Sequence, residues 1–270
     1  MEKGKLEELL SIAIFASIEA GKEIMKIYSS NFDIELKDDN SPLTLADKKS
    51  NDTILNRLSH SAIPVLSEEG KNVPYEERKS WNYLWIVDPL DGTKEFIKKN
   101  GEFTVNIALI QNQIPILGVI YCPTSQDLYF SLEDFGAFKI KIKNEINDFD
   151  LILNNAKKLP LNQKRNNYIV VGSRSHMSKE TEDFFEKKKK ENSNVEMLSI
   201  GSSLKICMVS EGSADVYPRY APTMEWDTAA GHAIANMSGY KIFEFQKDQE
   251  IRYNKENLLN PWFLVTKNES

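Results

Sequence analysis

The chain has 270 residues, of which 41% are hydrophobic and 27% are charged, and its formal net charge is −6. This composition is typical of a globular protein, and the acidic balance argues against a broad basic surface for long nucleic acids. Because no run of about 18 apolar residues occurs, we expect no transmembrane segment.

The first half of the chain is expected to hold two amphipathic helices, over residues 5–29 and 47–60, because apolar residues recur there at helical spacing. A turn is expected over 38–42. Short apolar runs bounded by turn residues predict strands over 34–37, 63–66, 83–87, 103–110, 114–121, 128–131 and 137–142.

A polar stretch, residues 143–167, follows and resembles a connection. Strands and helices then alternate, with strands expected over 168–172, 195–200, 214–217, 240–245 and 262–265 and helices over 178–190, 202–210 and 228–237. Such alternation predicts a layered α/β architecture. We expect two lobes of one continuous unit, residues 1–145 and 146–270, with a cleft between them.

The two cysteines, Cys122 and Cys207, are far apart and offer no metal-binding or disulfide pattern. The first residues lack the apolar core and the cleavage site of a signal peptide. A cytoplasmic protein is therefore expected. The sequence leaves open whether it also rests on the cytoplasmic side of the inner membrane and whether it forms a homodimer.

Residues 85–96 are the most informative segment of the chain. Their apolar part ends at Asp88, a proline then restricts the backbone, and Asp91 begins an Asp-Gly turn pair. Carboxylates that converge at a strand end repel each other unless a cation lies between them, and hard divalent cations such as Mg²⁺ suit such oxygen clusters. A helix beginning near Thr93 would add backbone N–H groups suited to a phosphate. The segment therefore indicates metal-dependent phosphate chemistry.

Each acid also has a simpler interpretation. Asp-Pro and Asp-Gly pairs occur in many loops that bind nothing. Glu68 fits a solvated loop, and Asp227, just before an expected helix, fits an N-cap. Acids at strand ends and helix starts are nevertheless where α/β folds collect ligands. From the residues alone, both interpretations stay open.

Three motifs taken together resemble one family. They are Val65-Leu66-Ser67-Glu68-Glu69, the segment 85–96 and Trp226-Asp227-Thr228-Ala229-Ala230-Gly231. Their order and approximate spacing resemble the inositol monophosphatase superfamily. With the block 100–109, the chain is most similar to the bacterial 3'(2'),5'-bisphosphate nucleotidases of that superfamily. The resemblance covers nearly the whole chain and implies an αβαβα sandwich of the inositol monophosphatase and fructose-1,6-bisphosphatase type.

The resemblance also implies roles for the matching residues. The ligands that it implies for two or three Mg²⁺ ions are Glu68, Asp88, the backbone carbonyl of Leu90, Asp91 and Asp227. It implies that Asp47 and Thr93 orient and activate the attacking water. The backbone N–H groups of Gly92 and Thr93 are expected to hold the scissile phosphate.

Residues that choose the substrate are expected in the second half, in segments 172–176, 201–205 and 217–219, which resemble those that bisphosphate nucleotidases use around the nucleotide. Lys205 and Arg219 are expected to hold a second phosphate, because Arg suits bidentate contact and Lys supplies a point charge. Ser202 is expected to donate to the same group, and His176 to contact the sugar or a phosphate. A solvated lysine and a loop histidine without a ligand are the alternatives.

The activity implied is Mg²⁺-dependent hydrolysis of the 3'-phosphate of adenosine 3',5'-bisphosphate to AMP and phosphate, in sulfur assimilation and with sensitivity to Li⁺. The expected partner is thus a small phosphorylated nucleotide, with 3'-phosphoadenylyl sulfate as a further substrate. An inositol or sugar phosphatase would use the same metal site. However, Lys94-Glu95 follows Thr93, whereas the inositol branch usually has Thr-Asn at the corresponding place. A non-catalytic nucleotide- or metal-binding protein is the alternative of another class.

Overall fold

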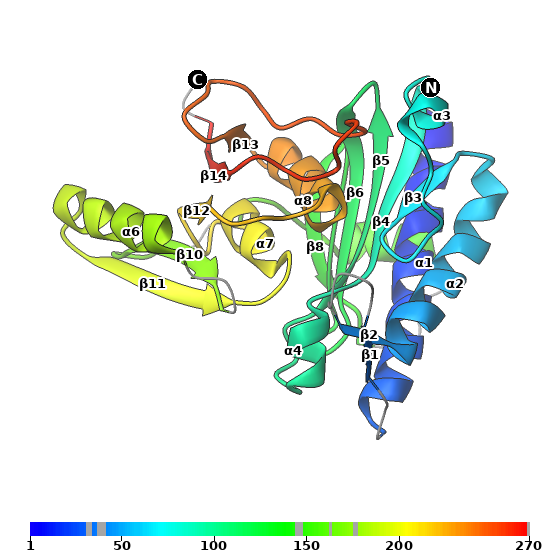
Figure 1. The fold of residues 1–270 in the computed structure, drawn as a ribbon, viewed down its shortest axis with the longest axis horizontal. Coiled ribbons are helices and arrows are strands. Elements are labelled where there is room, and N and C mark those ends of the chain that lie inside the picture. The colour runs from blue at the N-terminus through cyan, green and yellow to red at the C-terminus, as the bar shows by residue number, and fades with distance from the viewer. Residues whose placement is uncertain (31–33, 37–41, 144–147, 162–163, 175–177, 269–270) are drawn as a thin grey trace.

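The computed structural model describes residues 1–30, 34–36, 42–143, 148–161, 164–174 and 178–268. Its helices and strands form five layers in the order helix, sheet, helix, sheet, helix (Figure 1). The protein therefore has the mixed α/β sandwich that the resemblance implied.

The larger sheet has seven strands in the order β3–β4–β5–β6–β7–β8–β9. Their bounds are β3 Val65–Ser67, β4 Tyr83–Asp91, β5 Thr104–Gln111, β6 Ile114–Cys122, β7 Asp127–Leu132, β8 Gly136–Lys141 and β9 Lys157–Lys158. β3 and β4 run parallel, and all other neighbours are antiparallel. Helices α1 (Lys3–Tyr28) and α2 (Leu45–Leu58) cover one face of this sheet (Figure 1).

The smaller sheet has five strands in the order β11–β10–β12–β14–β13. Their bounds are β10 Tyr168–Ser173, β11 Val195–Ile200, β12 Val216–Arg219, β13 Tyr240–Glu244 and β14 Phe263–Lys267. β10 pairs in parallel with β11 and β12, whereas β14 pairs antiparallel with β12 and β13. A separate two-stranded sheet pairs β1 (Ile34–Leu36) antiparallel with β2 (Pro42–Thr44).

Helices α7 (Leu204–Ser210) and α8 (Glu225–Met237) form the layer between the two sheets, and α6 (Lys179–Glu191) packs on the smaller sheet. The remaining helices are short. They are α3 Tyr75–Arg78, α4 Thr93–Ile97, α5 Phe149–Asn155 and a 3₁₀ turn, Ser59–Ser61.

The larger sheet is buried on both faces. Along β4, Trp85 and Val87 belong to the core shared with α1 and α2, while Leu84 and Ile86 belong to the core shared with α7 and α8. This alternation follows from the two-residue period of a strand, and burial on both faces explains the continuous apolar run. The end of β4 therefore lies between two rigid cores.

Several element bounds differ from expectation. β4 continues past Val87 to Asp91, with a shift in register between Asp88 and Asp91, so the acids lie within the irregular end of a strand rather than in a turn after it. Helix α8 begins at Glu225 instead of Thr228, which places Asp227 inside the first helical turn. The expected position of Asp227 ahead of the helix was therefore wrong.

The polar stretch 143–167 is not only a connection. Its described residues include α5 and β9, and β9 adds an edge strand to the larger sheet by pairing with β8. Most of the turn expected over 38–42 lies outside the described residues.

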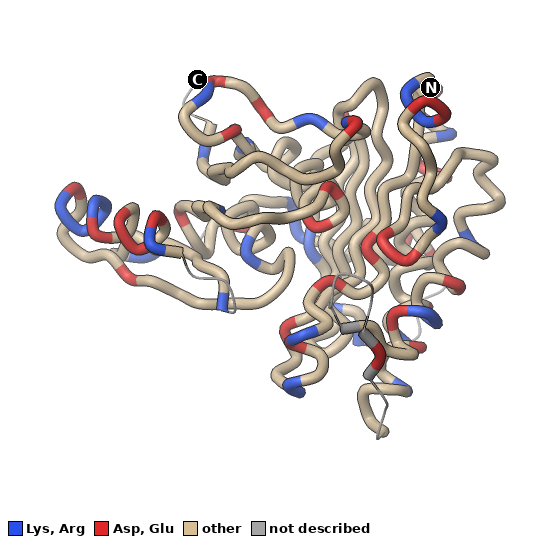
Figure 2. The backbone as a smooth tube through the Cα atoms, in the orientation of Figure 1, with Lys and Arg blue, Asp and Glu red and all other residues tan. Residues whose placement is uncertain are grey.

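Charged residues of both signs are interspersed over the molecule. Figure 2 shows this clearly along α6, where Lys188 and Lys189 pair with Glu191 and Glu186 at 2.7 and 2.8 Å. The four consecutive lysines of this helix, residues 187–190, therefore belong to its solvent-facing side. In the part of the chain that the structure describes, no helix is both long and apolar enough to span a bilayer.

Candidate active site

Three carboxylates from two elements converge at the end of β4. Asp88 and Asp91 come from the irregular end of this strand, and Asp227 comes from the first turn of α8. One oxygen of each lies within 4.8 Å of the other two. Asp88 also accepts a hydrogen bond from the backbone N–H of Leu90 at 3.1 Å, which stabilises the local bend.

Asp91 is held by residues from two elements. Its Oδ2 accepts a hydrogen bond from the backbone N–H of Ser203 at 2.6 Å and a longer one from Asn106 Nδ2 at 3.3 Å. The hydroxyl of Ser203 in turn donates to Asn106 Oδ1 at 2.9 Å. These contacts fix the carboxylate between the larger sheet and the start of α7.

All three acids have raised pKa values, and burial is the main cause in each. Burial raises the pKa of Asp88 well above its ordinary value, and the charges of Glu68, Asp91 and Asp227 raise it further. Burial and the charge of Asp91 raise the pKa of Asp227 to about 7. Burial also raises the pKa of Asp91, but the charge of Lys205 and the bond from Ser203 oppose that rise.

Such a cluster fits a hard divalent cation. Buried carboxylates that repel one another are stabilised as anions when a cation shares their oxygens, and Mg²⁺ prefers oxygen ligands. Glu68 adjoins the cluster, because its charge and hydrogen bonding both raise the pKa of Asp88. Its backbone N–H donates to Val87 O at 3.1 Å, which ties Glu68 to the end of β4.

Asp47 and Thr93 meet beside the acids. Thr93 Oγ1 lies 3.1 Å from Asp47 Oδ1 and 3.3 Å from the carbonyl oxygen of Leu90. The other oxygen of Asp47 accepts from the backbone N–H and the hydroxyl of Thr44 at 2.7 and 2.6 Å. Burial raises the pKa of Asp47, while the bonds from Thr44 and Thr93 lower it.

A cavity of about 310 Å³ unites most of the residues expected at the site. Its lining includes Glu68, Asp91, Gly92, Thr93, Ser202, Lys205, Arg219 and Asp227. Asp47, Asp88 and Leu90 adjoin this lining through the contacts described above. His176 lies outside the described residues.

Two cationic side chains line the cavity: Lys205 from α7 and Arg219 from the end of β12. Lys205 is buried, and its ammonium donates to the carbonyl oxygens of Ile200 at 3.2 Å and Ser202 at 2.5 Å. Burial lowers the pKa of Lys205 to about 8, although the charge of Asp91 opposes this. Arg219 Nη2 donates to Pro222 O at 2.9 Å, and its buried Nε has no hydrogen-bond partner among the described residues.

Sequence reasoning missed the residues that hold the acids. Thr44 was detectable, because a Thr three residues before an acid at a helix start is a capping pattern. Asn106 and Ser203 lie in the segments 100–109 and 201–205, but nothing local linked them to Asp91: Asn106 is inside an apolar strand, and Ser203 is 112 positions from Asp91. Their contribution depends on tertiary contacts.

The chain is similar to known proteins over nearly its whole length. The 3'(2'),5'-bisphosphate nucleotidase CysQ of Shigella flexneri is 43% identical over 251 residues, which cover 92% of this chain and 95% of that protein. The crystal structure of CysQ from Bacteroides thetaiotaomicron, described as a bacterial member of the inositol monophosphatase family, is 49% identical, with a TM-score of 0.90 over 98% of both chains.

A more distant structure shares the fold. An IMPase from Thermotoga maritima has a TM-score of 0.69 at 20% identity, over 96% of this chain and 92% of that one. The inositol monophosphatase family itself matches residues 5–267, which is nearly the whole chain. The protein therefore belongs to the inositol monophosphatase family.

Proposed function

We propose that this protein is a Mg²⁺-dependent 3'(2'),5'-bisphosphate nucleotidase that hydrolyses the 3'-phosphate of adenosine 3',5'-bisphosphate to AMP and phosphate. The observation that carries the proposal is the arrangement of charge around one cavity. The carboxylate cluster of Asp88, Asp91 and Asp227 lies beside two buried basic side chains, Lys205 and Arg219. Similarity to the CysQ relatives supports it. The acids would bind the metal, and the basic side chains would bind the second phosphate of a small substrate.

Glu68, Asp88, Asp91, Asp227 and the carbonyl oxygen of Leu90 are the proposed ligands of two or three Mg²⁺ ions. Bound Mg²⁺ supplies charge neutralisation at phosphate oxygens and makes water a stronger nucleophile. The family consists of metal-dependent phosphatases, so this requirement is expected.

Asp47 and Thr93 are the proposed pair that orients and deprotonates the attacking water. When the Thr93 hydroxyl donates its only hydrogen to Asp47, the lone pairs of its oxygen are free to accept a hydrogen bond from water. Because burial raises the pKa of Asp47, the carboxylate is a better proton acceptor than an exposed aspartate. Thr44 keeps this carboxylate in place through its two hydrogen bonds.

The two phosphates are proposed to bind different donor groups of the cavity. Backbone N–H groups of Gly92 and Thr93 hold the scissile phosphate, and Gly92 has φ +94°, a left-handed conformation that favours glycine. Lys205 and Arg219 hold the second phosphate, with Ser202 as an additional donor.

The same proposal covers substrate range and regulation by ions. 3'-Phosphoadenylyl sulfate carries the same 3'-phosphate and is a proposed further substrate, which places the enzyme in sulfur assimilation. His176 is a proposed contact for the sugar or a phosphate. Li⁺ is expected to inhibit by competing at a metal position.

Phosphate release from adenosine 3',5'-bisphosphate and from inositol 1-phosphate, measured side by side with Mg²⁺ and then with EDTA, tests the proposal. We expect a strong preference for the bisphosphate that EDTA abolishes. A preference for the inositol ester would keep the metal chemistry and overturn the substrate, whereas no release from either would favour a binding protein.

A further inference from the structure

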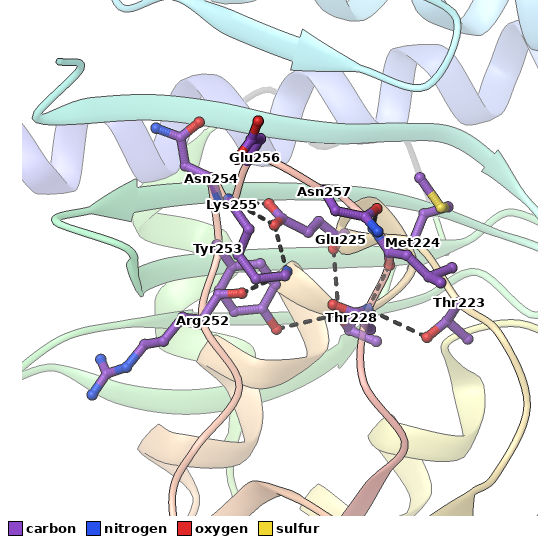
Figure 3. Close-up of polar contacts among 12 residues, drawn as sticks. Thr223, Met224, Glu225, Thr228, Arg252, Tyr253, Asn254, Lys255, Glu256 and Asn257 are labelled. Carbon is purple, nitrogen blue, oxygen red and sulfur yellow. Dashed lines mark hydrogen bonds and ion pairs between the residues drawn. The ribbon is translucent and has the colours of Figure 1, made fainter. Parts of the chain in front are cut away.

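A segment with no recognisable motif lies across the start of α8. Residues 252–260, which we call the strap, connect β13 to β14 and run beside the first turn of α8 (Figure 3). Three residues before this turn and within it, Thr223, Met224 and Glu225, form hydrogen bonds with the strap. The strap therefore contacts the turn that carries Asp227.

Glu225 is the central contact. Its side chain is fully buried, and its carboxylate accepts hydrogen bonds from the backbone N–H groups of Asn254 at 2.5 Å and Lys255 at 3.0 Å. The ammonium of Lys255 pairs with the same carboxylate at 2.5 Å (Figure 3). The backbone N–H of Glu225 donates to Leu258 O at 3.0 Å, so both ends of this residue are attached to the strap.

Asn260 fixes the neighbouring residues. Its backbone N–H donates to Thr223 O at 2.8 Å, and its Nδ2 donates to Met224 O at 2.7 Å and to Thr228 Oγ1 at 3.0 Å. Met224 is the residue whose N–H donates to Asp227 Oδ2 at 2.8 Å. The strap thus holds the donor that orients the Asp227 carboxylate.

The strap also contacts the segment between β3 and β4. Arg78 is buried at the end of α3, in the segment that follows Glu68 along the chain. Its guanidinium donates to Asn254 Oδ1 at 2.9 Å, Lys255 O at 2.6 Å and Glu256 O at 3.0 Å. Asn254 Nδ2 returns a bond to Arg78 O at 2.8 Å. These bonds join the strap to the part of the chain built around the larger sheet.

The site requires such a connection on electrostatic grounds. Asp227 lies beside Asp88 and Asp91, and the three buried carboxylates repel one another when they are ionised. Because Asp227 belongs to a different element from the other two, repulsion would move the first turn of α8 away from β4. Contacts that hold this turn in place reduce the free energy that a cation must supply to assemble its ligands.

We propose that Glu225 is a positioning residue: by binding the strap to the first turn of α8, it holds Asp227 beside Asp88 and Asp91 and so raises the affinity for the divalent cation. The inference rests on the proposed function, because it assumes that these acids bind Mg²⁺. Glu225 itself is not a ligand in this arrangement, since its carboxylate is occupied by Asn254 and Lys255.

The test is Glu225→Gln in the full chain, with Mg²⁺ binding measured by titration calorimetry in the absence of substrate. We expect the dissociation constant for Mg²⁺ to rise about tenfold or more, the usual effect of removing a group that orients a metal ligand. In assays, the Mg²⁺ concentration for half-maximal rate should rise similarly, while KM for the bisphosphate at saturating Mg²⁺ changes little.

Glu211→Gln is the matched control. Glu211 is also a buried carboxylate paired with a lysine, Lys139 at 2.7 Å, but its partners lie away from the first turn of α8. The Glu211→Gln variant should be less stable but should bind Mg²⁺ as tightly as the unaltered protein. Asn260→Ala is a milder second variant that should reproduce the loss of affinity if Glu225→Gln fails to fold.

The outcomes are separable. If the unaltered protein binds Mg²⁺ and both Glu225→Gln and Asn260→Ala bind it equally well, the positioning role is wrong and the proposed metal centre stands. If the unaltered protein does not bind Mg²⁺, the proposed metal centre is wrong and the positioning role falls with it. Weaker binding in both strap variants but not in Glu211→Gln would support the inference.

Discussion

Asp91 links the two halves of the candidate site. It adjoins Asp88 and Asp227 on one side, while on the other the charge of Lys205 opposes the rise in its pKa that burial causes. The backbone N–H of Ser203 donates to its Oδ2 at 2.6 Å, which keeps the carboxylate between the acids and the cations. The carboxylate of Asp91 therefore interacts both with the other acids and with the cationic side of the cavity, where a phosphate is expected to bind.

We expect Asp91→Asn to reduce kcat by more than about a hundredfold, because a ligand charge worth several kcal/mol in the transition state is lost. The amide keeps the size of the carboxylate, and its oxygen can still accept from Ser203, so the fold should be retained. Steady-state rates and circular dichroism test this together. Asp183→Asn, an exposed change on α6, is the control and should leave kcat unchanged. Retained activity in Asp91→Asn would contradict the mechanism.

Lys205 is the residue that distinguishes a bisphosphate from a monophosphate in this proposal. Two hydrogens of its ammonium go to Ile200 O and Ser202 O, and we expect a phosphate to accept the third. Lys205→Met should raise KM for adenosine 3',5'-bisphosphate about tenfold or more, which corresponds to one hydrogen bond to a charged group. KM for adenosine 3'-monophosphate should change far less. Equal increases for both substrates would remove Lys205 from the specificity site.

At the scale of elements, local sequence patterns predicted some helix and strand bounds, whereas others depend on long-range contacts. The apolar run of β4 predicted a strand that ends near Asp88. Capping by Thr44 explains why α2 begins earlier than its apolar spacing indicated. The early start of α8 combines both: Met224 N–H donates locally to Asp227, and Asn254 and Lys255 bind Glu225 from far along the chain. The two-residue edge strand β9 has no sequence pattern of its own and forms only because it pairs with β8.

The packing of α8 on the larger sheet depends on a glycine. A Cβ at Gly118, in β6, would overlap the carbonyl oxygen of Ala230 and lie 2.9 Å from Ala233 Cβ. Gly118→Ala should therefore lower the free energy of unfolding by about 1–3 kcal/mol, because α8 must shift. Thermal unfolding measures this loss. Gly4→Ala, where an added Cβ meets nothing within 4 Å, is the control, and equal melting temperatures for the two variants would contradict the expected clash.

At the scale of the whole molecule, the motifs predicted which acids would matter but not how they meet. Asp88 and Asp227 belong to different elements, and only the packing of α8 against the larger sheet brings them within 4.8 Å. The same packing introduces Ser203 and Asn106, which lie in the segments 201–205 and 100–109 but were assigned no role beside Asp91. The roles proposed for Lys205 and Arg219 remain predictions, although both line the cavity with Asp91.

The acid cluster makes the stability of the whole molecule depend on both pH and metal. Asp227 has a pKa of about 7 in the folded chain and an ordinary value of 3.8, and the pKa of Asp88 is also raised. Between these values, the metal-free folded chain binds more protons than the unfolded chain. The contribution of these acids to stability is therefore present below the ordinary pKa and is lost as the pH rises through about 7.

Bound Mg²⁺ should offset this loss by replacing the protons, so it should stabilise the protein more at pH 8 than at pH 6. The quantity to measure is the difference in melting temperature between a fixed excess of Mg²⁺ and EDTA, at each pH and constant ionic strength. Groups outside the cluster, such as His232, whose pKa is lowered by burial, are expected to affect both samples alike and cancel in this difference. Asp227→Asn removes one titrating ligand, so its Mg²⁺-dependent increment should be smaller and should change less with pH. An increment that is the same at both pH values in the unaltered protein would show that protons and Mg²⁺ do not compete at these carboxylates.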